Sequence, residues 1–512
     1  MQILKRKLFW VAVLYAGLLI WSGIYRYNTP PSQVPKDRKT VQVNAVAGDK
    51  TLPRKIRLAY KEYLPKKETE GQMPVVLIHG SPGDADAFDS LAEMMPMRRL
   101  ISVDLPGFGY SERNVPDYSI KAHAAYVYEL LRKLNVPKAH LVGFSLGGGV
   151  VTYLGAEHPD NVASIAYVSS IGVQEYEMFG NYPVNHFVHG AQVALIWALK
   201  EFTPNFGIFD GMAMPYAWNF YDTDQRPLRK MMSGLKMPVL ITHGVNDPLV
   251  PVEAAREHER IIPQSEYHEM IDNHFYVFMR PGMVEPSLLA FWKEVEAGKA
   301  VTRATASPER LKLAAEPFVP KFVSATGATA FVLFIALAIL AFINEDVAFI
   351  VAGLFAAQGR FGPVFAMTAC LFGILIAMFA FRRIGRRAGP LSRLISRAFP
   401  EGGAAWSRGF ADLLLCGLRE FGFVHRRYLD RGRRGTGFWK SLGLGLGSAL
   451  MRAPTMIGLC GAAAVLLKTL TPIANTDTVV LTLCLFLLYL TAAAATRFFA
   501  PFPRSSVLTT ED

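Results

Sequence analysis

Cysteine is absent from residues 1–369 of this 512-residue chain. The four cysteines present, Cys370, Cys416, Cys460 and Cys484, fall in the apolar C-terminal part, and their spacing is not that of metal ligands. From this distribution we expect neither a disulfide framework nor a zinc site. No metal or other cofactor is predicted. The sequence also lacks an internal repeat.

Acidic residues are scarce in residues 382–440, so most of the net positive charge of the chain lies in this one block. The formal net charge is +12, and residues 382–440 alone hold fourteen Lys or Arg against four Asp or Glu. Because this block lies between apolar segments, it indicates a basic surface that faces anionic lipid or the cytoplasm. Nucleic-acid binding is the weaker alternative and is not expected. Membrane lipids are the expected partners, and protein partners are left open.

Hydrophobic runs divide the chain into a soluble part and a membrane part. Residues 8–24 ("LFWVAVLYAGLLIWSGI") follow three basic residues and have the length of a membrane span, with a cleaved signal peptide as the alternative. The predicted organisation is an anchor at 1–28, a linker at 29–40, a soluble domain at 41–300, a connector at 301–322, a helical membrane domain at 323–500 and a tail at 501–512.

The soluble part predicts an α/β fold. Apolar runs such as "VVLIHG", "LISVDLPG", "HLVGFS", "ASIAYVSS" and "VLITHG" are bounded by turn residues and alternate with segments of helical spacing. Strands this apolar indicate a buried, mostly parallel, doubly wound sheet with helices on both faces.

One interval between two predicted strands, residues 172–235, is too long for a single crossover helix. It is rich in aromatic and methionine side chains, so we interpret it as a helical cap inserted over a site; extra helices packed on the core are the alternative. Members of this set include Trp197, Phe202, Phe206, Phe209, Met212, Met214 and Trp218.

Ser145 lies in "GFSLG", directly after a predicted strand and before a predicted helix. This is the setting in which a G-x-S-x-G pattern indicates a nucleophile on a sharp turn. The glycines on either side allow strand and helix to approach closely, and the helix amides point toward the charge that develops during attack on a carbonyl. The alternative is a small residue in a Gly-rich bend.

A nucleophilic serine requires a base, an orienting acid and oxyanion donors. Asp247 follows the strand "VLITHG", and His274 lies in "IDNHF" after a later strand, so the order serine, acid, histidine fits. His258 and His268 are alternative histidines, but they fall within a predicted helix and a predicted strand.

The oxyanion donors are expected in two places. The backbone amide of Leu146 supplies one, and the "HGSPG" turn supplies the other through the amide of Ser81. His79 in that turn is interpreted as a structural residue that holds the loop.

The motifs "LIHGSPG", "DLPGFGYS", "LVGFSLGG", "ITHGVNDPLVP" and "DNHF" together resemble the α/β-hydrolase superfamily over most of residues 41–296. The resemblance implies a Ser145–Asp247–His274 triad and a cap formed by the 172–235 insertion. A serine nucleophile argues against the epoxide hydrolase and haloalkane dehalogenase branches. Esterase or lipase, thioesterase, carbon–carbon bond hydrolase and peptidase activities remain, and the aromatic cap favours an apolar ester or lipid-like substrate.

The C-terminal part is similar to the DedA or VTT group of membrane proteins. The similarity is carried by "NEDVAFIVAGLFAAQGRFGPVFAMTACLFGI", the "RRIGRRAG" that follows, and "LMRAPTMIGLCGAA". It implies an acidic residue at a re-entrant hairpin and a buried arginine in a second hairpin. Glu345, Asp346 and Arg452 are therefore candidate functional residues, although the two carboxylates would serve equally as caps of a loop in water.

Three functions follow as hypotheses. The leading one is a serine hydrolase, anchored in the cell membrane with several spans, that cleaves carboxylic esters. The alternatives are a lipid transporter or scramblase with an accessory or inactive hydrolase domain, and a binding scaffold. Basic residues flank the first span on both sides, so the side of the membrane that the soluble domain faces is undecided.

Overall fold

The computed structural model describes residues 2–29, 33–67, 71–177, 180, 182–209, 211, 213–318, 327–357 and 361–387, with isolated positions 439, 450, 453, 457 and 458. The chain divides into two compact units, Met1–Pro320 and Lys321–Asp512.

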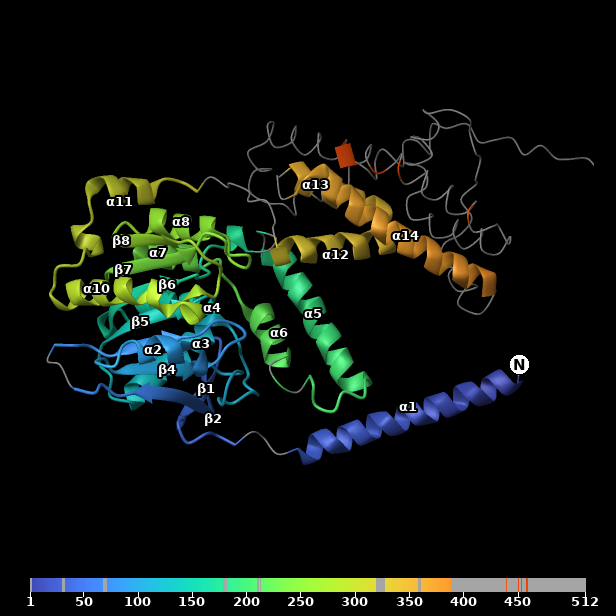
Figure 1. The fold of residues 1–512 in the computed structure, drawn as a ribbon, viewed down its shortest axis with the longest axis horizontal. Coiled ribbons are helices and arrows are strands. Elements are labelled where there is room, and N and C mark those ends of the chain that lie inside the picture. The colour runs from blue at the N-terminus through green and yellow to red at the C-terminus, as the bar shows by residue number, and fades with distance from the viewer. Residues whose placement is uncertain are drawn as a thin grey trace, which may run out of the picture. The chain divides into compact units, whose positions relative to one another are not determined.

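A single eight-stranded sheet forms the centre of the described first unit (Figure 1). Its order is β1-β2-β4-β3-β5-β6-β7-β8; the pairs β1/β2 and β2/β4 are antiparallel, and all later pairs are parallel. The predicted, mostly parallel sheet is therefore confirmed. The strands are β1 Lys39–Ala47, β2 Lys50–Tyr63, β3 Val75–Ile78, β4 Leu100–Asp104, β5 Ala139–Phe144, β6 Val162–Val168, β7 Val239–Gly244 and β8 Ser265–Met270.

Helices cover both faces of the sheet because alternate strand residues point to opposite sides. Val76 and Ile78 of β3 belong to one apolar core, whereas their neighbours Val75 and Leu77 belong to the other. The helices are α2 Asp89–Glu93, α3 Ile120–Lys133, α4 Leu146–Glu157, α8 Val252–Ile261, α9 Tyr276–Met279, α10 Glu285–Glu296 and α11 Pro308–Ala315; short 3-10 turns are Ala85–Phe88, Pro159–Asn161, Gln174–Tyr176, Pro281–Met283 and Arg303–Thr305.

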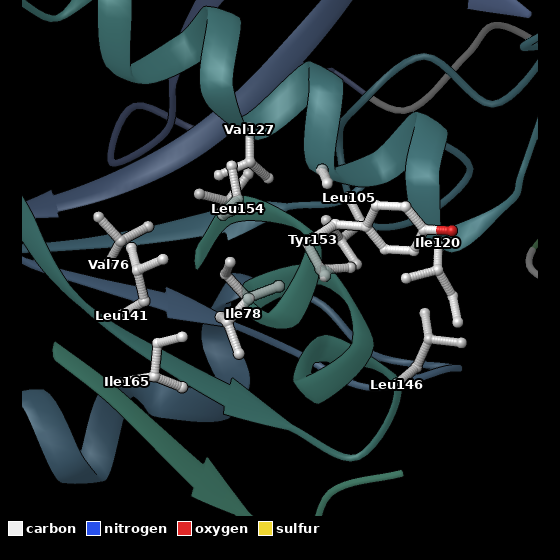
Figure 2. Close-up of a cluster of buried hydrophobic side chains, with 14 of the residues drawn as sticks. Val76, Ile78, Leu105, Ile120, Val127, Leu141, Leu146, Tyr153, Leu154 and Ile165 are labelled. Atoms are coloured by element: carbon white, nitrogen blue, oxygen red, sulfur yellow. The ribbon is translucent and has the colours of Figure 1, made fainter. Parts of the chain in front are cut away.

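Figure 2 shows part of the apolar core between the sheet and helices α3 and α4, including Leu146, the residue that follows Ser145. Strand side chains Ile78 and Leu141 face Val127 of α3 and Leu154 of α4, and all four are buried. This packing fixes α4 against the sheet, so the turn that joins β5 to α4 has a rigid support on each side.

The interval between β6 and β7 holds three helices, α5 Tyr182–Phe202, α6 Ala213–Asp222 and α7 Leu228–Gly234. Leu228 and Met232 of α7 lie in the same core as α4, so α7 packs on the sheet. For α7 this agrees with the alternative of a helix packed on the core, whereas a cap formed by the remaining helices, α5 and α6, stays a prediction.

Helices of the expected membrane segments are α1 Gln2–Asn28 in the first unit and α12 Gly327–Ile343, α13 Glu345–Ala357 and α14 Pro363–Arg387 in the second. Among the described residues, Phe9–Asn28 and Pro363–Arg387 are long and apolar enough to cross a membrane, which is weak evidence by itself. Residues 388–500 of the predicted helical membrane domain, apart from isolated positions, lie outside the described residues. The multi-pass arrangement stays a prediction.

Candidate active site

Ser145 stands alone between the last residue of β5 and the first residue of α4. Its backbone has φ 52° and ψ −119°, a left-handed conformation that non-glycine residues rarely adopt. Ser145 is partly exposed, whereas every other residue of 139–155 is buried. The turn therefore presents this one side chain at the surface of an otherwise closed core.

The two glycines of "GFSLG" are required by close backbone contacts. A Cβ on Gly143 would lie 2.5 Å from the carbonyl oxygen of Gly147, and one on Gly147 would lie 2.3 Å from that of Ile78. No side chain fits at either position without displacing backbone. The two glycines of the G-x-S-x-G pattern thus have a steric cause.

Asp247 and His274 form a buried pair after strands β7 and β8. Nδ1 of His274 donates to Oδ2 of Asp247 at 2.6 Å. Oδ1 of Asp247 accepts the backbone N–H groups of Leu249 at 2.8 Å and of Val250 at 2.9 Å. These bonds orient the carboxylate and, through it, the imidazole.

His243, at the end of β7, is a residue that the sequence analysis missed. Its Nε2 lies 2.9 Å from the carbonyl oxygen of Val250 and 3.2 Å from Oδ2 of Asp247. The sequence does carry a signal for it, because His243 lies four residues before Asp247, near the end of the strand that Asp247 follows. Asp247 is thus held between two imidazoles.

The charge state of Asp247 follows from these contacts. Burial alone would raise the pKa of this carboxyl, but the hydrogen bonds from His243 and His274 outweigh burial and lower the pKa below its usual value. The carboxylate is therefore ionised at neutral pH and acts as an acceptor for the Nδ1 proton of His274.

His274 approaches the serine turn through Phe144, the residue before Ser145. The two rings lie 4.7 Å apart between centroids. Within the described residues, no hydrogen bond joins Oγ of Ser145 to His274. The structure therefore brings acid and histidine together and sets the histidine beside the serine turn, while the Ser145–His274 contact stays a prediction. Such contacts are often long until substrate binds.

The predicted oxyanion loop lies directly against Ser145. A Cβ on Gly80 would come within 2.8 Å of the Cβ of Ser145. Within residues 71–177, the backbone amides of Ser81 and Leu146 donate to no protein acceptor. Both amides are therefore available to a ligand, as oxyanion donors must be.

His79 holds this loop in place. Its Nδ1 donates to the carbonyl oxygen of Gly80 at 2.6 Å, and its Nε2 accepts the N–H of Leu105 at 3.0 Å. Burial lowers the pKa of His79, so the ring is neutral, which this pair of contacts requires. The geometry agrees with the structural role expected for His79.

The alternative histidines lie in other surroundings than the Asp247–His274 pair. His268 contacts Ser287 at 3.1 Å and Glu266 at 2.8 Å near the surface. His258 is fully buried, and burial lowers its pKa to about 3. Neither is bonded to Asp247.

A second missed feature lies under the oxyanion loop. Nε of Arg38 donates to Oδ2 of buried Asp104 at 3.2 Å, and Oδ1 of Asp104 accepts the N–H of Ala85 at 2.7 Å. Arg38 falls within the predicted linker, yet its side chain is 1% exposed. Residue 38 therefore belongs to the folded domain.

The candidates in the second unit are only partly described. Glu345 is buried at the start of α13. Asp346 is in the same helix, but its side chain and the whole of Arg452 lie outside the described residues. In the part of the chain that the structure describes, no group of His, Cys, Asp and Glu has the arrangement of a metal site.

Comparison with known proteins gives the same fold for the first unit. A family model described as alpha/beta hydrolase fold matches residues 73–192. The chain is 37% identical over 108 residues to the dihydrolipoyllysine-residue acetyltransferase component of the acetoin cleaving system of Pseudomonas putida, which is 21% of this chain and 29% of that protein. The match thus spans less than a third of that relative.

Longer matches are weaker in identity. The pimeloyl-[acyl-carrier protein] methyl ester esterase of Vibrio vulnificus is 26% identical over 235 residues, 39% of this chain and 86% of that protein. A solved esterase from Thermogutta terrifontis is 21% identical, covers 50% of this chain and 99% of its own, and has a TM-score of 0.40.

The strand order, the elbow at Ser145 and the family match define an α/β-hydrolase fold. The first unit therefore has an α/β-hydrolase fold, with the family match over residues 73–192, and the proteins that it is similar to include esterases and other hydrolases. The resemblance of the C-terminal part to the DedA or VTT group stays a prediction.

Proposed function

We propose that this protein is a membrane-anchored serine hydrolase that cleaves carboxylic esters with apolar acyl groups. The observation that carries the proposal is the coincidence of three features at one edge of the sheet. These are the strained, partly exposed Ser145, the Asp247–His274 hydrogen bond of 2.6 Å, and the amides of Ser81 and Leu146, which donate to no acceptor within residues 71–177.

The proposed reaction begins with proton transfer from Ser145 to His274. Nε2 of His274 removes the hydroxyl proton as Oγ of Ser145 bonds to the ester carbonyl carbon. The carbonyl oxygen becomes an oxyanion, which the amides of Ser81 and Leu146 stabilise. Asp247 keeps the proton on Nδ1 and stabilises the imidazolium.

Collapse of the tetrahedral intermediate releases the alcohol. The bond from carbon to the alkoxy oxygen breaks, and His274 returns its proton to that oxygen, which leaves an acyl group on Ser145. Water then loses a proton to His274, attacks the acyl carbon and frees the carboxylic acid. No electron acceptor or metal is required for either half of this sequence.

The expected substrate class follows from the cap and the anchor. Helices α5 and α6 of the predicted cap are rich in aromatic and aliphatic residues, which favours an apolar acyl group over a charged one. The apolar helix Phe9–Asn28 supports anchoring in a membrane. The similarity to a methyl ester esterase supports the choice of ester chemistry.

The test is hydrolysis of a series of p-nitrophenyl esters by the purified full chain. We expect activity in the wild type and its loss in Ser145→Ala. The matched control is Ser233→Ala, because the hydroxyl of Ser233 donates to the carbonyl oxygen of Lys230 within α7 itself and should be dispensable. Equal rates for Ser145→Ala and wild type, or no hydrolysis by a folded wild type, would contradict the proposal.

A further inference from the structure

Helix α5 of the predicted cap carries an exposed apolar stripe along its length. Phe187, Leu195 and Phe202 are 76%, 59% and 57% exposed, and Ala191 and Ala194 between them are also exposed. Steps of three or four residues place side chains on the same face of a helix. A helix in contact with water normally has charged residues on such a face.

Charge is absent from most of this helix and from the loop after it. Residues 182–199 contain no Lys, Arg, Asp or Glu, and neither do residues 202–209, "FTPNFGIF". Ile208 in this loop is 75% exposed. We call the exposed face of α5 together with residues 202–209 the cap stripe.

The cap stripe is continuous with the N-terminal apolar helix. The N–H of Phe206 donates to Oγ of Ser22 in α1 at 2.8 Å. The ring of Phe206 also packs edge-on against Trp21 and Tyr25, with centroid distances of 5.3 and 5.8 Å. The loop is thus in direct contact with the candidate membrane span.

Two further contacts extend this junction along α1. The hydroxyl of Tyr15 donates to the carbonyl oxygen of Phe202, and Nη1 of Arg26 donates to that of Lys200 at 3.1 Å. At the rise of an α-helix, the part of α1 from Tyr15 to Arg26 is about 16 Å long. This length is about half the thickness of the hydrocarbon core of a bilayer. If α1 crosses a bilayer, this loop must lie at the depth of one leaflet.

We propose that the cap stripe is a membrane-docking surface, seated in the interface of the bilayer that α1 crosses, and that apolar esters reach the site from that layer. The inference rests on the membrane-anchored hydrolase proposed above. A bilayer fits better than a protein partner because residues 182–199 hold no Lys, Arg, Asp or Glu and the loop after α5 is in direct contact with α1. The first charged residues, Lys200 and Glu201, lie beside Arg26 at the end of α1.

The first experiment measures contact with lipid independently of catalysis. One environment-sensitive fluorescent amino acid replaces Phe187, Ile208 or, as the control, Lys138, in the full chain reconstituted into phosphatidylcholine vesicles. Lys138 is exposed just before β5, at the opposite end of the parallel strands from the cap. Vesicles with brominated acyl chains should quench the probe at 187 and 208 but not at 138. Absence of quenching at both cap positions, or equal quenching at 138, would overturn the proposal.

The second experiment separates docking from chemistry. The triple variant Phe187→Gln/Leu195→Gln/Ile208→Gln should retain wild-type kcat/KM on a water-soluble short-chain ester, which also shows that it is folded. Its rate on a long-chain ester dispersed in vesicles should fall about tenfold, the effect of removing interfacial anchoring by large apolar side chains. Lys138→Gln should change neither rate. An unchanged vesicle rate with intact soluble activity would refute docking alone, whereas no soluble activity even in the wild type would refute the hydrolase.

Discussion

Replacement of Asp247 by Asn tests the acid–histidine pair with almost no change in shape. The two backbone amides of Leu249 and Val250 require an acceptor at the Oδ1 position, so the amide oxygen must occupy that place. The NH₂ group then takes the place of Oδ2, 2.6 Å from Nδ1 of His274. A donor there forces the neutral imidazole to carry its proton on Nε2, which can no longer accept the proton of Ser145.

The expected loss is large because the wrong tautomer removes the base. A serine-hydrolase triad loses about 10⁴ in kcat on this change, which is about 5.5 kcal/mol of transition-state stabilisation at about 1.4 kcal/mol per tenfold. The variant should remain folded, with a cost of about 1–3 kcal/mol for the imperfectly paired buried groups. It should also bind esters with little change in KM.

The assay is steady-state hydrolysis of a short-chain p-nitrophenyl ester, with circular dichroism as the test of folding. Asp160→Asn is the matched control, since Asp160 is exposed in a 3-10 turn at the far end of the sheet. A folded Asp247→Asn protein whose kcat lies within about tenfold of wild type would refute the assignment of Asp247 as the orienting acid.

Three further predictions concern stability. Gly147→Ala forces a Cβ to 2.3 Å from a β3 carbonyl oxygen, so it should cost about 1–3 kcal/mol in urea unfolding and reduce activity; Gly234→Ala, with nothing within 4 Å, should be neutral or stabilising. Arg38→Met leaves the buried carboxylate of Asp104 without its cation and should lower stability by about 3–5 kcal/mol; an unchanged unfolding midpoint would contradict this. The folded-state pKa of Asp247 is lowered, so its stabilisation is complete above its unfolded pKa of about 4 and is lost as pH falls toward the folded value. The free energy of unfolding should therefore drop below about pH 4, and by less in Asp247→Asn.

The turn at Ser145 was predictable because its cause is local. The glycines, the apolar strand before them and the helix after them are all within ten residues, and the structure has the elbow where the pattern predicts it. The buried parallel sheet was predictable for a similar reason, since its strands are continuously apolar.

Features that depend on contacts between residues far apart in the chain could not be predicted from the sequence in the same way. Arg38 looks like a solvated charge in a Pro-rich linker, and only the fold brings it to Asp104, sixty-six residues away. The contact between Phe206 and Ser22 joins residues 184 positions apart. His243 was missed because a histidine at the end of a strand has many uses, and its contact with Asp247 depends on how the loop after β7 turns back.

The central claim is that Ser145 is a nucleophile activated by His274, and covalent labelling tests it most directly. The full chain in detergent is treated with a fluorophosphonate, and the modified peptide is identified by mass spectrometry. We expect one phosphonyl group on Ser145. Ser145→Ala should abolish the labelling, and His274→Ala should slow it strongly. Labelling at another residue, equal labelling of Ser145→Ala, or no labelling of a folded wild type would contradict it.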